Sequence, residues 1–307
     1  MKSNLKSIYI ISSLFIISSC GGGGGGGGAA AVQKLAATIS SFTSSIFSTE
    51  VGSSVEITWS SSNSSSCSAS GGWSGTKAVN GSETIEVSSV GDTTYTLTCS
   101  GEGGNASRTI TIEGYRNIVG IAVDGYISGA SIFIDMDEDY SLDSNETSTT
   151  SSTDGSFTIK YENGVLASLG GQDVDTQTQL DNLLLIRDLS GYTESSFMIT
   201  PVTSVAHFMP SQDIYNLLGL DSDLDIYTTD PVANIGSGAG YDLLYEKGNQ
   251  LTILAYSLQN ISNDLNSSMD STADYFKAIS DEIALEYSDT EAAVNIEKGA
   301  FIERVID

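Results

Sequence analysis

The first part of the chain alternates apolar and polar residues with a period of two, from about residue 35 to residue 114. This period is typical of β-strands that have one face in a core and the other in water. Glycine-containing turns, such as those at Gly71 and Gly81, separate the alternating stretches. Residues 35–114 are therefore expected to form a small all-β sandwich. The alternating positions include Val55, Ile57, Trp59, Tyr95, Leu97, Cys99, Ile110 and Ile112.

A second alternating region, residues 115–200, surrounds an acidic loop. Ile132 and Ile134 lead into the loop, and Phe157 and Ile159 lead out of it, each pair at strand spacing. The pattern predicts a second β-sandwich in which the loop bridges two strands.

Helical spacing begins at Pro201, a residue that suits the first turn of a helix. Further along, apolar residues recur at steps of three and four and predict one amphipathic stripe. Ser271 with Asp274, and Ser288 with Glu291, have the spacing of capping boxes and predict the starts of two further helices. Residues 201–307 are thus expected to be an α-helical bundle. The amphipathic stripe consists of Leu251, Leu254, Leu258, Ile261 and Leu265.

Apolar residues continue almost to Asp307 without a helix stop signal. Two explanations remain open, a truncated reading frame and a chain end that docks against the bundle.

The N-terminus has the layout of a secretory signal, in which basic residues, an apolar stretch and small residues follow one another. Lys2 and Lys6 precede the apolar residues 8–17, a stretch shorter than the roughly 20 residues that span a membrane. Eight glycines, Gly21–Gly28, follow Cys20, and glycine runs hold no fixed structure.

The run Ile17-Ser18-Ser19-Cys20 resembles the lipobox of bacterial lipoproteins. The resemblance implies that residues 1–19 are a lipoprotein signal peptide and that Cys20 carries a lipid anchor, with residues 20–34 forming the lipidated cysteine and glycine linker. By the same analogy, Gly21 in place of Asp favours the outer membrane, on its cell-surface or periplasmic side. The alternative is an ordinary cleavable signal with an incidental cysteine.

The net charge of the chain restricts the classes of partner that it can bind. The chain has 39 acidic and 12 basic residues, a net charge of −27, and most of the acidic residues follow residue 115. Such a charge repels nucleic acid and attracts cations, so no nucleic-acid partner is expected.

After lipidation only Cys67 and Cys99 remain, and outside the cytoplasm they can form one disulfide. We expect it to join the two sheets of the first sandwich.

The acidic loop has oxygen-bearing residues at positions 1, 3, 5, 7, 9 and 12, which is the ligand spacing of a 12-residue calcium loop. Calcium, bound for structure, is therefore the predicted cofactor. Position 6 of such loops is normally Gly because the turn needs positive φ, and Tyr140 at this position predicts strain and a site that is either weakened or slightly rearranged. The competing interpretation is an acidic surface loop without an ion. The predicted ligands are Asp135, Asp137, Asp139, Ser141 through its backbone carbonyl, Asp143 and Glu146.

Three segments resemble modules of bacterial surface proteins. Residues 56–99 resemble a bacterial immunoglobulin-like domain, which implies a spacer or a binding module. Residues 123–157 resemble the calcium-braced, prealbumin-like sandwiches of large adhesins, in which calcium stiffens the module. The segment 199–232 resembles the helical part that follows the sandwich in the same proteins. Asp173 and Asp175, in another segment of that resemblance, either help to bind a second ion or form a solvated turn, and the turn is favoured.

The sequence predicts no catalytic site and no organic cofactor. His207, the single histidine, is expected to be structural, and no nucleophile-elbow sequence surrounds Ser204. We interpret the chain as a multidomain, calcium-stabilised structural or adhesion lipoprotein at the cell surface. Its expected partners are the membrane, through the anchor, and a surface polysaccharide or protein ligand. The alternative is a carbohydrate- or polymer-binding lipoprotein that serves a neighbouring transporter or enzyme, which an exposed Trp73 would favour.

Overall fold

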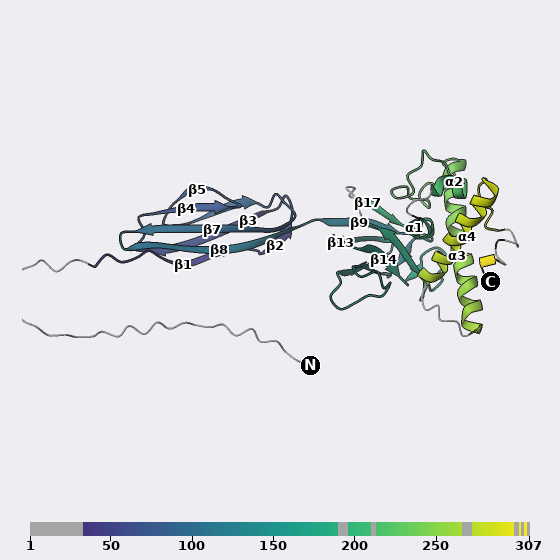
Figure 1. The fold of residues 1–307 in the computed structure, drawn as a ribbon, viewed down its shortest axis with the longest axis horizontal. Helices are drawn as coiled ribbons and strands as arrows, with labels where there is room; N and C mark the ends of the chain where they lie inside the picture. Colours follow the sequence, from purple (N-terminus) through teal and green to yellow (C-terminus); the bar gives the residue numbers. More distant parts are fainter. Residues whose placement is uncertain are drawn as a thin grey trace, which may run out of the picture.

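The computed structural model (Figure 1) describes residues 33–189, 196–209, 213–265, 272–297, 301, 304 and 305. The predicted signal peptide, Cys20 and the glycine run lie outside the described residues. In Figure 1 two β-rich bodies follow one another, and a single chain segment between β8 and β9 joins them. The helices pack at the end of the second body that faces away from the first.

The first body is a sandwich of two sheets, with the strand orders β1-β3-β6 and β2-β8-β7-β4-β5. β2 runs parallel to β8, and the other neighbours pair antiparallel. In β3 the residues Val55, Ile57 and Trp59 are buried between more exposed ones, and the two-sheet arrangement confirms the predicted all-β sandwich. The strands are β1 (Thr38–Ser44), β2 (Ser48–Glu50), β3 (Ser54–Ser62), β4 (Ser66–Gly71), β5 (Gly75–Lys77), β6 (Asn80–Glu86), β7 (Gly91–Gly101) and β8 (Gly104–Tyr115).

The predicted disulfide between Cys67 and Cys99 is present, with the two Cα atoms 4.0 Å apart. Its expected position between the two sheets is wrong. Cys67 of β4 and Cys99 of β7 are direct partners in the antiparallel register of one sheet. Opposite residues of an antiparallel pair lie close enough for a disulfide, so the bridge links neighbouring strands.

Aromatic rings hold the two sheets together instead. The ring of Trp73 stacks on that of Phe42 with centroids 5.7 Å apart and meets the ring of Trp59 edge-on at 5.5 Å. The Trp73 indole N–H donates to the carbonyl of Thr96 over 3.1 Å. Only 6% of Trp73 is exposed, so the exposed ring that would favour the carbohydrate-binding alternative is not present at this position. The Gly/Ser-rich composition around it reflects a tight turn over the core.

The second body is built from a three-stranded sheet, β13-β9-β17, and a four-stranded sheet, β12-β11-β14-β16, with the short pair β10-β15 beside them. β17 runs parallel to β9, and the remaining neighbours pair antiparallel. This confirms a second β-sandwich. The strands are β9 (Asn117–Ala122), β10 (Ile127–Ser128), β11 (Ser131–Asp135), β12 (Ser148–Thr150), β13 (Ser156–Lys160), β14 (Val165–Leu169), β15 (Gln172–Asp173), β16 (Leu184–Asp188) and β17 (Ser196–Ile199).

The helical region is also confirmed, with α1 (Pro201–His207), α2 (Ile214–Leu218), α3 (Ala239–Leu265) and α4 (Thr272–Thr290). Thr200 caps α1 in a capping box with Thr203, and Pro201 takes the first helical position. The helix expected to start at Ser288 is not there, because α4 runs through this residue and residues 291–297 form turns and irregular chain. The Ser288 hydroxyl donates back to the carbonyl of Leu285.

The helices complete the core of the second body. One hydrophobic cluster extends from Ile118 of β9 through both sheets and the helices to Phe301. A second cluster, called here the outer cluster, covers the opposite face of the four-stranded sheet; Phe208 and Tyr140 pack against it. Strands β11, β14 and β16 are thus buried on both faces, which explains their continuous apolar runs. The outer cluster consists of Phe133, Val165, Ala167, Leu184, Ile186 and Ala273.

Candidate calcium loop

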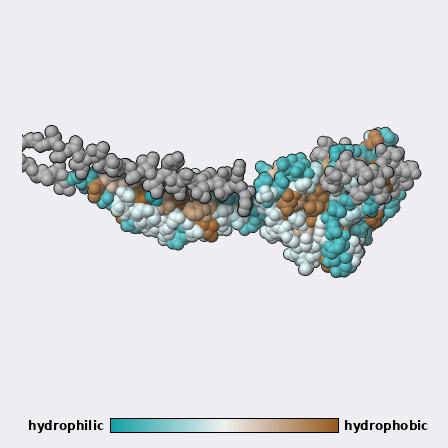
Figure 2. All heavy atoms as spheres, turned by 90° about the horizontal axis from the view of Figure 1, so that it is seen from below, coloured by the Kyte–Doolittle hydropathy of each residue, from teal (hydrophilic) through white to brown (hydrophobic). Residues whose placement is uncertain are grey.

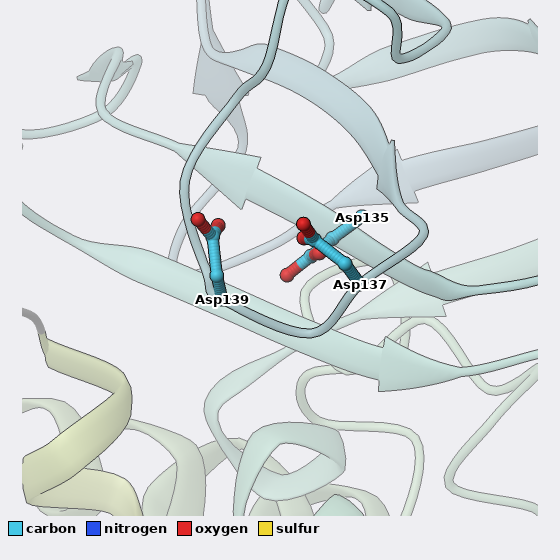
Figure 3. A group of neighbouring side chains, drawn as sticks. All are labelled: Asp135, Asp137 and Asp139. Atoms are coloured by element: carbon cyan, nitrogen blue, oxygen red, sulfur yellow. The ribbon is translucent and has the colours of Figure 1, made fainter.

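The acidic loop begins at the end of β11, which lies between β12 and β14 in the four-stranded sheet. The loop ends where β12 begins. Asp135 is the last residue of β11 and is fully buried, whereas Asp137 and Asp139 are exposed. Carboxylate oxygens of these three residues lie within 4.8 Å of one another. Figure 3 shows Asp135 and Asp137 close together and Asp139 on the opposite arm of the loop. The strand end therefore fixes one carboxylate, and the loop curls the other two toward it.

Backbone N–H groups organise the start of the loop around Asp135. One carboxylate oxygen of Asp135 accepts from the N–H of Glu138 over 2.7 Å, and the other accepts from the N–H of Tyr140 over 2.8 Å. Asp139 accepts from the N–H of Ser141 over 2.8 Å. These bonds curl the chain so that alternate side chains converge, as a calcium loop requires.

Glu146 closes the loop from its other end. Its two carboxylate oxygens accept from the N–H of Met136 over 2.8 Å and from the N–H of Asp143 over 3.0 Å. The twelfth position therefore ties the two arms together. The group of three neighbouring carboxylates does not include Asp143 or Glu146, and the side chain of Ser141 is not part of it.

The predicted conformation at position 6 is correct even though the residue is not glycine. Tyr140 has φ of 62°, and Glu138 two residues earlier has φ of 60°. Positive φ is unfavourable for a bulky residue, so a tyrosine needs compensating contacts. The Tyr140 ring has them, because it packs against the outer cluster and lies edge-on to the rings of His207 and Phe208.

The electrostatics of the loop oppose closure without a cation. Burial raises the pKa of Asp135, the N–H groups of Tyr140 and Glu138 lower it, and the charges of Glu146 and Asp139 raise it again. A cation among these carboxylates would offset both the burial and the repulsion.

The donor set fits a hard divalent cation. Calcium binds oxygen ligands at 2.3–2.6 Å, so two oxygens on opposite sides of one ion are about 5 Å apart. The carboxylate oxygens of the three aspartates are at most 4.8 Å apart, a separation compatible with a single ion between them. Asp135, Asp137 and Asp139 would hold it, with oxygens of Ser141, Asp143 and Glu146 as the further predicted ligands.

The other residues weighed from the sequence have structural contacts. The Ser204 hydroxyl donates to the carbonyl of Thr200 and accepts from the N–H of Ile186, both over 2.9 Å. Asp173 accepts from the N–H groups of Asp175 and Thr176, which is the pattern of a turn.

Sequence reasoning missed one carboxylate, that of Asp124. It follows β9, accepts from the Thr252 hydroxyl of α3 over 2.9 Å, and is half-buried. Burial raises its pKa to about 6; the Thr252 bond lowers the pKa, and the charge of Asp173 raises it. Its only signal in the sequence, an Asp-Gly pair, is that of an ordinary solvated turn.

Comparisons with known proteins leave the function open. No protein family and no curated protein matches the chain. Among solved structures, three N-terminal domains of the highly immunogenic outer capsid protein of bacteriophage RB49 align with a TM-score of 0.22 and 12% identity, over 48% of this chain and 68% of that one. The fibronectin(III)-like modules of Clostridium thermocellum CbhA align with a TM-score of 0.20 and 14% identity, over 52% of this chain and 98% of theirs.

The Bacillus anthracis TIE protein aligns with a TM-score of 0.21 and 10% identity, over 52% of this chain and 39% of that one. TM-scores this low carry no argument about function, so the fold assignment rests on the strand pairings above. Across the described ranges, no helix has both the length and the apolar character needed to cross a membrane.

Proposed function

We propose that this protein is a membrane-anchored, calcium-stabilised structural or adhesion lipoprotein of the bacterial cell surface, without catalytic activity. The observation that carries the proposal is the loop at the end of β11, where three carboxylates converge within 4.8 Å around the buried Asp135. A cation there would tie β11 to β12 and stiffen the second body.

The arrangement of the bodies supports a spacer role. The two sandwiches follow one another along the long axis of the molecule (Figure 1). On the face drawn in Figure 2 the surface of the sandwiches is largely pale or teal, with separate brown patches. Scattered apolar residues are normal for a protein surface. The alternative carbohydrate-binding role loses its candidate residue, since the Trp73 ring is in the core.

Calorimetry of the mature chain in calcium and in EDTA tests the proposal. For a dissociation constant of about 10⁻⁴–10⁻³ M, typical of extracellular modules, 10 mM calcium stabilises the native state by about 1.4–2.7 kcal/mol through mass action. We expect the transition of the second body to move to higher temperature. Asp137→Asn removes a predicted ligand and should abolish the shift.

Glu138→Gln is the matched control, because Glu138 lies at the fourth loop position, carries the same charge and is not a predicted ligand. This variant should keep the calcium shift. If wild type and both variants shift equally, calcium acts on general surface charge and the stiffening role is wrong.

The anchor is tested separately through Cys20. Cys20→Ser should release the protein from the membrane fraction or leave its signal uncut. Unchanged membrane partition and unchanged mass of the variant would contradict lipidation. That result would not affect the proposal of calcium binding.

A further inference from the structure

Tyr140 contacts both the acidic loop and the helical region. Its backbone N–H donates to Asp135, the buried carboxylate of the loop, over 2.8 Å. Its side chain reaches the end of α1, 67 residues further along the chain. One residue therefore touches both the candidate cation site and the helical region.

The side-chain contacts lie at the C-terminal end of α1. The Tyr140 hydroxyl is 3.5 Å from Nε2 of His207, and the two ring centroids are 6.3 Å apart at 90°. The ring of Phe208, which caps α1, is 6.0 Å away at 68°. Edge-to-face contacts of this kind contribute about 0.5–1.5 kcal/mol beyond the area they bury.

The same ring also reaches the start of α4. Tyr140 packs against the outer cluster, which contains Ala273 from the first turn of α4 as well as Ile186 from β16. It thus fills the junction of the loop, the four-stranded sheet and two helices.

The backbone of Tyr140 shows why this placement is unusual. A left-handed conformation costs a non-glycine residue about 1–2 kcal/mol, and glycine would adopt it freely. Tyr140 is the only aromatic residue among the non-glycine residues with positive φ in the described ranges. The ring contacts offset a cost that glycine would not incur, which connects the loop conformation to the packing of α1.

We propose that the contacts of Tyr140 couple cation binding in the loop to the order of α1 and of the start of α4. The proposal rests on the proposed function, since it needs a cation in the loop. Binding that fixes the Asp135 carboxylate also fixes the Tyr140 N–H and its positive φ. The ring is then held against His207 and Phe208, and the backbone hydrogen bonds of α1 open less often. By linkage, loss of the α1 contacts weakens cation binding by the same factor.

Hydrogen exchange of the mature chain, measured with calcium and with EDTA, tests this coupling. In wild type we expect calcium to slow exchange both in the loop and in α1, in α1 by at least about 5-fold, the low end of typical coupling. In Tyr140→Gly the loop keeps its conformation without the ring. We expect slowed exchange in the loop and less than about 2-fold change in α1. Tyr140→Phe keeps the ring and should behave as wild type.

Calorimetric titration with calcium separates this inference from the proposed function. Wild type that binds no calcium overturns the proposed function itself. The coupling is wrong if wild type binds calcium but exchange in α1 does not slow. It is also wrong if calcium slows exchange in α1 of Tyr140→Gly as much as in wild type. Either result leaves calcium binding itself intact. Tyr140→Asn replaces the glycine variant if that one fails to fold, because asparagine also tolerates positive φ.

Discussion

Lys160 and Glu113 form an ion pair that joins the two sandwiches. Nζ of Lys160, on β13, donates to Oε1 of Glu113, on β8, over 2.6 Å. The Lys160 ammonium also lies 5.4 Å from the centre of the Tyr115 ring. The bond to Lys160, followed by that to Ser48, lowers the pKa of Glu113, and the bond to Glu113 raises the pKa of Lys160. The contact spans the single-chain connection, so we expect it to restrict bending between the two bodies.

Lys160→Met should loosen this connection with little effect on stability. Both side chains are about one-third exposed, at 31% and 37%, and exposed ion pairs contribute only about 0.2–1 kcal/mol. Small-angle scattering should show a broader distribution of overall length for the variant. Lys277→Met, which removes an exposed pair with Asp281 within α4, is the control and should leave the distribution unchanged. Identical scattering from all three proteins would contradict the restricting role.

Removal of the disulfide should destabilise the first sandwich. The bridge spans a sequence separation of 32 residues, for which the chain-entropy estimate is about 3–4 kcal/mol. Both tryptophans of the chain, Trp59 and Trp73, belong to the core of the first sandwich, so urea denaturation followed by tryptophan fluorescence reports on this body alone. We expect Cys67→Ala with Cys99→Ala to lower the midpoint strongly. A midpoint equal to that of wild type would show that the strand pairing holds without the bridge.

Trp73→Ala tests whether Trp73 is a core residue or a ligand platform. Loss of a buried tryptophan typically costs about 3–5 kcal/mol, so calorimetry should show the first sandwich melting far below wild type. The second body should melt unchanged, which makes it an internal control. Trp73→Phe should recover part of the loss. A stable Trp73→Ala variant would contradict the packing against Phe42 and Trp59.

The sequence predicts those strands of this fold that have one face in the core and the other exposed to solvent. Alternation in β3 locates its buried residues correctly because each second side chain meets water. In β14 and β16 both faces are covered, so period two gives no information there. The position of the disulfide could not be derived either, since one inward cysteine does not reveal which sheet holds its partner.

Ligand spacing located the candidate loop, but not what surrounds it. Three of the predicted carboxylates converge, and the positive φ at position 6 follows from the loop geometry alone. The partner of Tyr140 is 67 residues away and that of Asp124 is 128 residues away, and no local pattern encodes such contacts. For this reason the sequence suggests a weakened site where the structure has a supported turn.

Asp124 should make the second body more stable in mild acid. The folded-state pKa is about 6, above the unfolded value of 3.8, because burial disfavours the charged form. Above pH 6 both states are ionised and the folded state carries the cost of a partly desolvated charge. As the pH falls from about 7 to about 4, the folded protein takes up the proton first. The contribution of Asp124 to the free energy of unfolding therefore rises over this window.

Asp124→Asn removes the charge with little change in shape and should raise stability at pH 8. It should also flatten the pH dependence between about 4 and 7 relative to wild type. Urea denaturation in EDTA, followed by circular dichroism of the helices, reports on the second body. Asp175→Asn removes a nearby exposed charge and serves as the control. Because acid also relieves the general repulsion of a chain with net charge −27, only the difference between the two variants is informative. Equal curves for both variants would assign the acid stabilisation to overall charge and not to Asp124.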